Sequence, residues 1–287
     1  MPKRAEYKRY TRTRAGNVMY FSILILAGAF TMLPMIYCIC TAFKPLDELL
    51  VFPPRFFVHR PTVENFVLLP VLIDKLRVPL SRYVFNSVFI TTVATAAHIF
   101  VSSMAAYVLA KTNVPLKGLI FTVVQLSLLY NGYTLAVPQY LIFSKLFLID
   151  TIWVYILPAI PASTGVFLIK QYMDSSVPDT LLEAARIDGA HPFTIYWEVV
   201  MPIIKPAWMT LMLLSFQSLW SVIPSGTIFS EELKTLPYVL SSISAGGIAR
   251  AGSSMAATVL MMLPPIAVLF ITQSNVMETM STAGMKG

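Results

Sequence analysis

Six long runs of apolar residues dominate this sequence, and each is long enough to cross a membrane. The hydrocarbon core of a bilayer is about 30 Å thick, so a helix needs about 20 apolar residues to span it. With 56% hydrophobic and only 12% charged residues, the chain is one that water alone does not solvate. We therefore expect an integral membrane protein with spans at approximately 18–43, 83–110, 118–137, 151–173, 207–224 and 255–273.

The runs are continuous and lack the strict alternation of barrel strands. Because only helices and closed barrels satisfy every backbone group in lipid, continuous runs favour helices. We predict an all-α fold with a basic tail at 1–17 and a single transmembrane domain of six helices at 18–287. The first run is too long for a signal-peptide core and lacks a small-residue cleavage site, so we expect it to stay in the protein.

The tail before the first run is strongly basic, and this sets the predicted orientation. Basic residues beside a membrane helix stay in the cytoplasm, so both termini of a chain with six crossings should be cytoplasmic at the plasma membrane. The loop at 174–206 then faces inward, and segments 44–82 and 225–254 face outward. The position of the tail favours contact with anionic membrane lipid over nucleic acid, which we do not expect as a partner. The basic residues are Lys3, Arg4, Lys8, Arg9, Arg12 and Arg14.

The inward loop contains a polar island, EAARIDGA at 183–190, in a chain otherwise nearly free of charge. Ser175 or Ser176 is a predicted helix cap, and Pro178 suits the first turn that follows. Gly189 suits the left-handed residue that ends such a helix. A second short helix is expected over 193–200, before two prolines.

The paired alanines Ala184 and Ala185 offer almost no side-chain bulk, so another backbone can approach this helix closely. Two interpretations are open at this point. The helix either docks in the groove of a partner, or it is a surface helix that packs only on its own bundle.

Residues 183–206, EAARIDGAHPFTIYWEVVMPIIKP, resemble the EAA loop of permease subunits of ABC importers. That pattern is EAA, two residues, DGA, an aromatic, an aliphatic residue and two spaced prolines. Tyr196 stands where phenylalanine is usual and Met201 where leucine is usual, and both changes keep an apolar bulk.

The likeness extends along most of the chain and points to the second of the two paired permeases of carbohydrate importers. A departure lies at QSLWSVIPSG, 217–226, where that family often has a Trp-Asn pair and further aromatics, so its sugar-contacting residues are not transferred. The matching phrases are FKPLDELLVFPP (43–54), PTVENF (61–66), NSVFITTVATAAHIFVSSMAAYVLAKTNVP (86–115), VPQYLIFSKLFLIDT (137–151) and TLPYVL (235–240).

The resemblance implies that the loop is a coupling helix that docks in a cleft of an ATP-hydrolysing subunit. The implied partners are a second related permease, ATPase subunits, an extracellular solute-binding protein and a carbohydrate, expected to be an oligosaccharide. This chain has no G-x-x-x-x-G-K-[ST] motif, so ATP belongs to the partner and no cofactor is expected here. The expected ATPase-coupling residues are Glu183, Ala184, Ala185, Asp188, Gly189, Ala190 and Pro202.

Enzyme chemistry has little support in the sequence. His59, His98 and His191 lie in distant segments, so no metal site is expected, and no Ser-His-acid grouping is recognisable. A secondary transporter would need intramembrane acids or an internal repeat, and the spans carry almost no acids. An ABC importer permease for a non-sugar solute is the closer alternative.

Two polar faces within the spans are candidates for the substrate path. Thr91, Thr95, His98 and Ser102 share one face of the second span, where they either line the path or join helices by hydrogen bonds. The fifth span offers polar groups and flat aromatic rings, both of which a sugar needs. Trp220 could instead belong to an aromatic belt at the membrane edge. The candidate path residues are Thr210, Phe216, Gln217, Trp220, Ser221 and His98.

Overall fold

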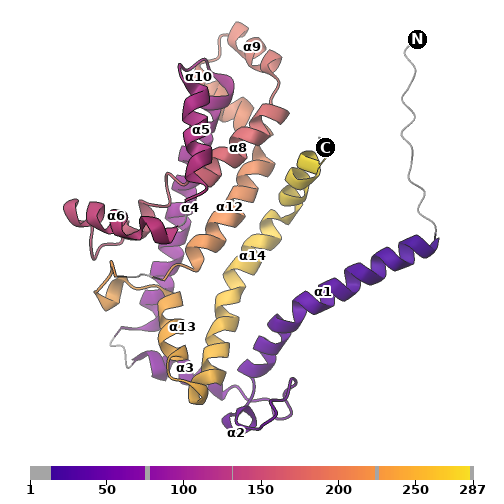
Figure 1. Cartoon of the computed structure of the whole chain (residues 1–287), viewed down its shortest axis with the longest axis vertical. Coiled ribbons are helices and arrows are strands. Elements are labelled where there is room, and N and C mark those ends of the chain that lie inside the picture. Colours follow the sequence, from indigo (N-terminus) through magenta and orange to yellow (C-terminus); the bar gives the residue numbers. More distant parts are fainter. Residues whose placement is uncertain (1–13, 75–77, 131, 224–225, 285–287) are drawn as a thin grey trace.

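The computed structural model describes residues 14–74, 78–130, 132–223 and 226–284, and within these ranges the chain is all-helical. Three long helices run along the bundle: α4 (Leu80–Lys111), α12 (Lys205–Trp220) and α14 (Ala251–Gly284). Figure 1 shows α9 (Asp179–Ile187) at one end of this bundle, and α2 (Leu46–Leu49) and α3 (Glu64–Asp74) at the other. We call these the α9 end and the α3 end.

Four of the predicted spans coincide with helices long and apolar enough to cross a membrane. The first is α1 (Arg14–Ala42), the second is α4, and the sixth is α14. The fourth is the stretch Trp153–Ser176. It consists of α7 (Trp153–Ile156) and α8 (Ser163–Ser176), with turns between them that contain Pro158 and Pro161.

The fifth predicted span is shorter than expected and starts at a sharp bend. It corresponds to α12, which is preceded by the helical stretch Pro192–Ile203 at an angle of 77°. With 16 residues, α12 is about 24 Å long, which is less than the hydrocarbon thickness. The described chain therefore supplies four spanning helices, or five if this bent pair is one span.

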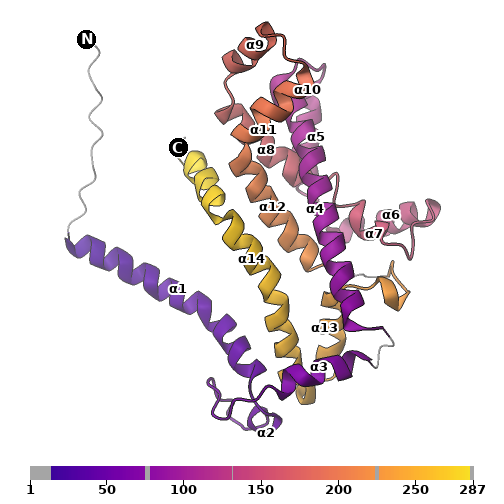
Figure 2. The same ribbon diagram turned by 180° about the vertical axis from the view of Figure 1, so that it is seen from behind.

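The third predicted span, 118–137, is wrong as a continuous helix. The structure has α5 (Lys117–Ser127), turns at 128–130, and then α6 (Gly132–Lys145). Figures 1 and 2 show α6 lying across the bundle instead of along it. The run is apolar, as predicted, but hydropathy does not report where a helix is interrupted. Residue 131 lies outside the described residues, and α6 begins at Gly132.

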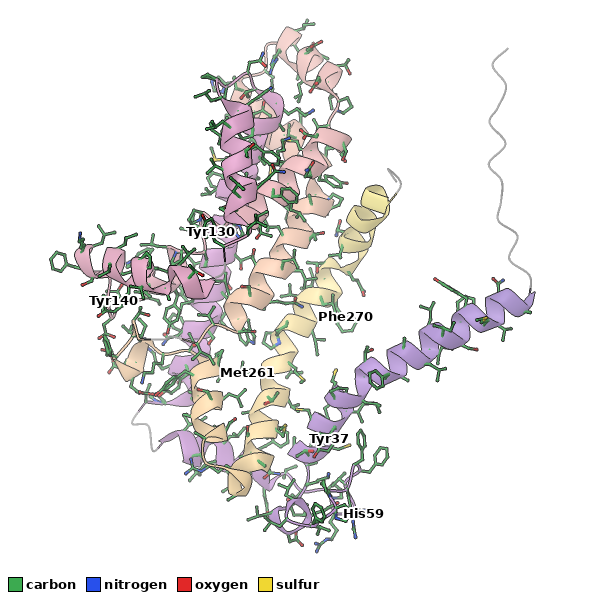
Figure 3. The ribbon with its side chains drawn as sticks, in the orientation of Figure 1. Tyr37, His59, Tyr130, Tyr140, Met261 and Phe270 are labelled. Carbon is green, nitrogen blue, oxygen red and sulfur yellow. The ribbon has the colours of Figure 1, made fainter. Side chains whose placement is uncertain are left out.

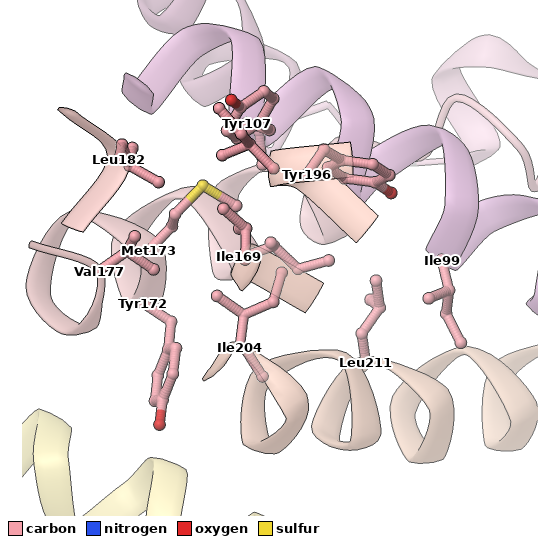
Figure 4. Packing of buried hydrophobic residues seen from close by; sticks show 14 residues of the cluster. Ile99, Tyr107, Ile169, Tyr172, Met173, Val177, Leu182, Tyr196, Ile204 and Leu211 are labelled. Atoms are coloured by element: carbon pink, nitrogen blue, oxygen red, sulfur yellow. The ribbon is translucent and has the colours of Figure 1, made fainter. Parts of the chain in front are cut away.

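Three groups of buried side chains hold the bundle together. The largest, at the α9 end, joins α4, α8, α9 and α12, and Figure 4 shows its side chains, with Met173 and Ile169 in the space between Leu182 and Tyr196. A second group at the α3 end joins α3, α4, α14 and α13 (Leu236–Ser244). A third joins α4 to α6 and α7. Because α4 contributes to all three groups, it is the central support of the fold.

In contrast, α1 leaves the bundle. It packs on α14 near the α3 end, and Figure 1 shows it diverging from the other helices toward its amino-terminal end. Apolar side chains such as Phe30, 74% exposed, cover its surface. This helix is a membrane span whose neighbours are lipid or another subunit, because water would not tolerate such a surface.

The α3 end is closed by short elements. The loop before α3 carries His59 (Figure 3), whose backbone N–H donates to Glu48 Oε1 at 2.9 Å. The amide of Asn65 donates to the carbonyl oxygens of Ala42 and Lys44, at 2.9 and 2.7 Å, which fixes α3 to the end of α1. Two single-turn helices complete this half, Glu231–Leu233 and Ile248–Arg250.

Candidate functional site

Helix α9 is fixed to the bundle by apolar packing and by the side chain of Lys111. Leu182 is buried in the group of side chains at the α9 end. At the start of the helix, the Lys111 ammonium, from the end of α4, donates to the Val177 carbonyl at 2.6 Å and to Asp179 Oδ1 at 2.8 Å. The Lys111 side chain is 6% exposed and that of Asp179 is 77% exposed. The hydrogen bond from Lys111 holds the pKa of Asp179 below its ordinary value.

The predicted cap of α9 is wrong, whereas the predicted end is confirmed. Ser175 and Ser176 lie in the last turn of α8, so neither is free to cap the next helix. Pro178 occupies the cap position and has no side chain that could accept a hydrogen bond; Lys111 fixes this end of the helix instead. At the other end, Gly189 has a φ of +80°, the left-handed conformation expected there.

The second half of the loop is helical, as predicted, and turns into the bundle. Residues Pro192–Thr194 form α10, Ile195–Val200 form one π-helical segment, and Met201–Ile203 form α11. The Tyr196 hydroxyl lies 2.7 Å from Ser103 Oγ of α4, and its ring packs against Tyr107. The hydroxyl that distinguishes Tyr196 from the usual phenylalanine therefore has a buried partner.

The residues expected to couple to an ATPase divide into two groups. Ala185 and Ala190 pack against the chain's own buried side chains. Glu183, Ala184, Asp188, Gly189 and Pro202 are exposed, and so is Ile187, at 85%. We call Glu183, Ala184, Ile187, Asp188 and Gly189 the α9 surface. It combines a small residue, an apolar side chain and two carboxylates, all held on a helix whose opposite side is buried.

A cavity of about 580 Å³ opens in the middle of the bundle, between α4, α6, α7, α8 and α12. We call it the central cavity. Its walls are mainly apolar and aromatic, with a few polar groups, as is usual for small-molecule sites. Figure 3 shows Tyr140, one of its wall residues, on the transverse helix α6. The polar and aromatic groups that line it include His98, Gln139, Tyr140, Tyr155, Thr164 and Ser218.

His98 is the one predicted path residue that lines the central cavity. Its Nδ1 lies 2.8 Å from Ser215 Oγ of α12, and its Nε2 lies 3.0 Å from the Ala162 carbonyl oxygen, just before α8. The imidazole thus joins three elements while one edge borders the cavity. Both interpretations of His98, helix joining and path lining, fit this position.

The other predicted path residues lie elsewhere on α12. Thr210 is buried and donates to the Pro206 carbonyl at 2.8 Å. Trp220 is buried, stacks on Phe216, and donates from Nε1 to the Met261 carbonyl of α14 at 3.0 Å. Gln217 and Ser221 are exposed, with Ser221 Oγ donating to the Gln217 carbonyl at 3.1 Å.

The polar stripe on α4 is buried along its whole length. A Cβ built on Gly165 of α8 would overlap His98 Nε2 and Ser102 Oγ and would lie 2.8 Å from Ser102 Cβ. The His98 and Ser102 part of the stripe therefore lies where α4 and α8 approach closely. Among the described residues, the buried hydroxyls of Thr91, Thr95 and Ser102 have no hydrogen-bond partner, so joining of helices by hydrogen bonds is supported for His98 only.

Sequence reasoning missed most of the cavity wall. Gln139, Tyr140 and Tyr155 come from segments whose polar character was visible, yet only the folding of α6 across α4 and α7 brings them to one place. The motif VPQYLIFSKLFLIDT, already noted for its family likeness, was the available signal. Within the described part of the chain, no group of three or more His, Cys, Asp and Glu side chains is placed to hold a metal.

Comparison with known proteins gives one family match and many relatives. Residues 98–282 match the family of binding-protein-dependent transport system inner membrane components. The sulfoquinovosyl glycerol transport system permease protein SmoH of Agrobacterium fabrum is 30% identical over 273 residues, covering 93% of this chain and 92% of SmoH. The sn-glycerol-3-phosphate transport system permease protein UgpE of Yersinia enterocolitica is 30% identical over 201 residues, covering 68% of this chain and 70% of UgpE.

A solved structure shares the fold. It belongs to a bacterial ABC transporter involved in the import of the acidic polysaccharide alginate, and it superposes with a TM-score of 0.75 at 21% identity, covering 92% of this chain and 98% of the other. The family is a multi-pass inner membrane component whose ATPase resides on a separate subunit. The chain belongs to the family of binding-protein-dependent transport system inner membrane components, the permease subunits of ABC importers.

Proposed function

We propose that this chain is one of two paired permeases of a carbohydrate importer and that the α9 surface docks on a partner ATPase subunit. The observation that carries the proposal is the division of α9 into a buried side, held by Leu182, and an exposed side with Ile187 and Glu183. A helix held in this way cannot move without the bundle. Force applied to its outer side therefore reaches α4, α8 and α12, which share its buried side chains.

Two substitutions on the α9 surface test the coupling role. Glu183→Ala and Gly189→Val should abolish uptake and weaken copurification of the ATPase, because the first removes a docking charge and the second introduces a β-branched residue at a φ of +80°. Glu232→Ala, at an exposed acid far from α9, is the matched control for the first change. Normal ATPase binding and uptake in both variants would contradict the proposal.

We infer that the substrate path includes the central cavity and the exposed side of α12. A residue that lines a path between two paired permeases is exposed to solvent when one permease is considered without the other. Gln217 and Ser221 meet this condition, and His98 reaches the path through the cavity wall. Thr210 and Trp220 are buried by the chain's own helices, so their predicted sugar contacts would require α12 to move. Phe216 is partly exposed and stacks on Trp220.

Glutamine substitutions test this path because the chain provides a matched control. Gln139→Leu in the cavity wall and Gln217→Leu on α12 should each raise the substrate concentration for half-maximal uptake about tenfold, since the loss of one or two hydrogen bonds costs about 1–2 kcal/mol. Gln125→Leu on α5 is exposed and outside the cavity, and should leave uptake unchanged. Equal behaviour of all three variants would remove the cavity from the path.

We propose that the α9 end faces the cytoplasm, together with both termini. The basic tail, of which residues 1–13 lie outside the described residues, supports this orientation. In Figure 2 the carboxyl-terminal end of α14 lies toward the α9 end. In a variant without Cys38 and Cys40, Ile187→Cys should react with a membrane-impermeant maleimide only in inside-out vesicles, and Phe57→Cys, near the α3 end, only in right-side-out vesicles. The opposite pattern would reverse the orientation.

The relatives favour a glycoside or a polyol phosphate as substrate. SmoH is named for a sugar-glycerol conjugate and UgpE for a glycerol phosphate. We propose a carbohydrate, expected to be an oligosaccharide, as the first class to test and a polyol phosphate as the second, because the described cavity wall has hydroxyl, amide and aromatic groups but no arginine or lysine. The complete transporter, reconstituted in vesicles, would be screened with glycans and with polyol phosphates. The class that stimulates ATP hydrolysis is the substrate class.

A further inference from the structure

A second cavity, of about 270 Å³, lies in the α3 end between α3, α4, α13 and α14. We call it the apolar cavity. Every residue that lines it is apolar, apart from the indole of Trp220 at its inner end. That indole N–H already donates to the Met261 carbonyl, and Figure 3 shows Met261 on the side of α14 nearest to α13. The described wall therefore offers no hydrogen bond to water or to a sugar hydroxyl.

The chemistry of the wall determines what can fill this space. Apolar cavities of about 150 Å³ stay dry and bind small hydrocarbons, and the apolar cavity is larger. It is too small for a helix, whose diameter with side chains is about 10–12 Å. An occupant must therefore be a flexible or compact apolar group, and the hydrocarbon chains of the bilayer are the abundant source beside a membrane span.

The exposed residues of the cavity wall lie near the amino-terminal end of α4, where a helix centred in the bilayer would pass from the headgroups into the lipid chains. With 32 residues, α4 is about 48 Å long, so about six residues at each end lie beyond the 30 Å hydrocarbon core. Val84 and Val88, at the rim, are 38% and 47% exposed and fall at this boundary. Arg82, two residues before Val84, lies over the Phe85 ring and donates from Nε to the Glu232 carbonyl. At this end of α4 the guanidinium would lie at headgroup depth, and a guanidinium pairs readily with a phosphate.

We propose that the apolar cavity binds the acyl chain of one phospholipid from the leaflet at the α3 end, with the headgroup beside Arg82. The acyl chain enters between Val84, Val88 and Leu260 and ends against the face of Trp220. This ligand site is separate from the central cavity and does not depend on the transported solute.

Photochemical labelling of the complete transporter tests the site. The complex would be reconstituted in vesicles of phosphatidylcholine and phosphatidylglycerol containing a trace of phospholipid with a diazirine at the end of one acyl chain. After irradiation, peptide mapping should find label on Val88 and Leu240 in the wall, and also on Phe270, which is 66% exposed on α14 and reports general contact with lipid.

Two variants fill the cavity from different helices: Ala257→Leu on α14 and Leu240→Trp on α13. Each should reduce labelling of Val88 severalfold and leave labelling of Phe270 unchanged. Leu263→Trp, at an exposed α14 position outside the wall, is the matched control and should change neither. The second filling variant keeps the test valid if the first does not assemble.

Two results would overturn the proposal. One is label on Phe270 without label on Val88 or Leu240, which would mean that another subunit covers the mouth. The other is Val88 labelling that neither filling variant reduces, which would mean contact with the rim only. Replacing Arg82 by glutamine separates the two parts of the ligand: label on Val88 should persist, while the preference for phosphatidylglycerol over phosphatidylcholine should fall.

Discussion

Gly165 shows at the scale of one residue how closely two helices of this permease pack. Alanine normally stabilises a helix relative to glycine by about 1 kcal/mol. At Gly165, however, the added methyl would overlap His98 and Ser102, and overpacking costs about 1–3 kcal/mol. We therefore expect Gly165→Ala to lower the thermal stability of the purified transporter, measured by loss of monodisperse protein on heating.

The matched control is Gly118 of α5, where an added Cβ meets nothing within 4 Å. Gly118→Ala should leave the melting temperature unchanged or raise it. If both alanine variants behave alike, close approach between α4 and α8 is not what position 165 requires.

At the scale of one element, the position of α9 depends more on the hydrogen bond from Lys111 to the Val177 carbonyl than on the ion pair between Lys111 and Asp179. The Asp179 carboxylate is mostly exposed, and solvent screening leaves such ion pairs with only a small contribution to stability. The bond from the buried ammonium to the Val177 carbonyl is worth about 1.5–3 kcal/mol. Lys111→Met should therefore increase hydrogen exchange over residues 178–187 about tenfold or more, as measured by mass spectrometry, while 163–173 stays protected.

Asp179→Asn should have a smaller effect, and its pH dependence follows from the pKa. Because Lys111 lowers the pKa of Asp179 in the folded state, the ionic contribution is fully present above the ordinary carboxyl pKa and is lost as the pH falls through the lower folded value. The difference between the wild type and Asp179→Asn in the protection of residues 178–187 from hydrogen exchange, corrected for the intrinsic effect of pH, should then be constant from about pH 5 to 8. A difference that changes within this range would contradict the assignment.

At the scale of the whole molecule, the described helices form one packed block and one outlying span. Helices α4, α8, α9 and α12 share a single group of buried side chains, and packed interfaces favour discrete arrangements over gradual bending. Spin labels at Thr180 of α9 and Val101 of α4 should keep their separation within about 2 Å between nucleotide-free and ATP-bound transporter. A larger change would show that α9 moves independently of the bundle, and the coupling described above would need a hinge.

Composition and local sequence pattern were sufficient to predict much of this architecture. The membrane class, the helical fold, the polar loop and the left-handed Gly189 follow from local properties, since hydrophobic length and a glycine conformation each depend on a few neighbouring residues. The EAA motif was sufficient for the family, which the comparisons confirm.

Contacts between distant segments could not be read in this way. Ser175 and Ser176 have the chemistry of helix caps, but α8 continues through them because its residues pack on α4. The interruption of the third span turns α6 across the bundle, and this places Gln139 opposite His98 and Ser218 in the central cavity.

The sequence by itself determined that the chain spans the membrane as helices and carries a polar loop of the EAA type, because hydrophobic length and short-range backbone preference are local quantities. Only the tertiary structure decided which side of α9 is exposed, which polar groups share a cavity, and that Trp220 faces α14. Those outcomes depend on side chains separated by tens to hundreds of residues, whose meeting is set by packing and not by any one segment.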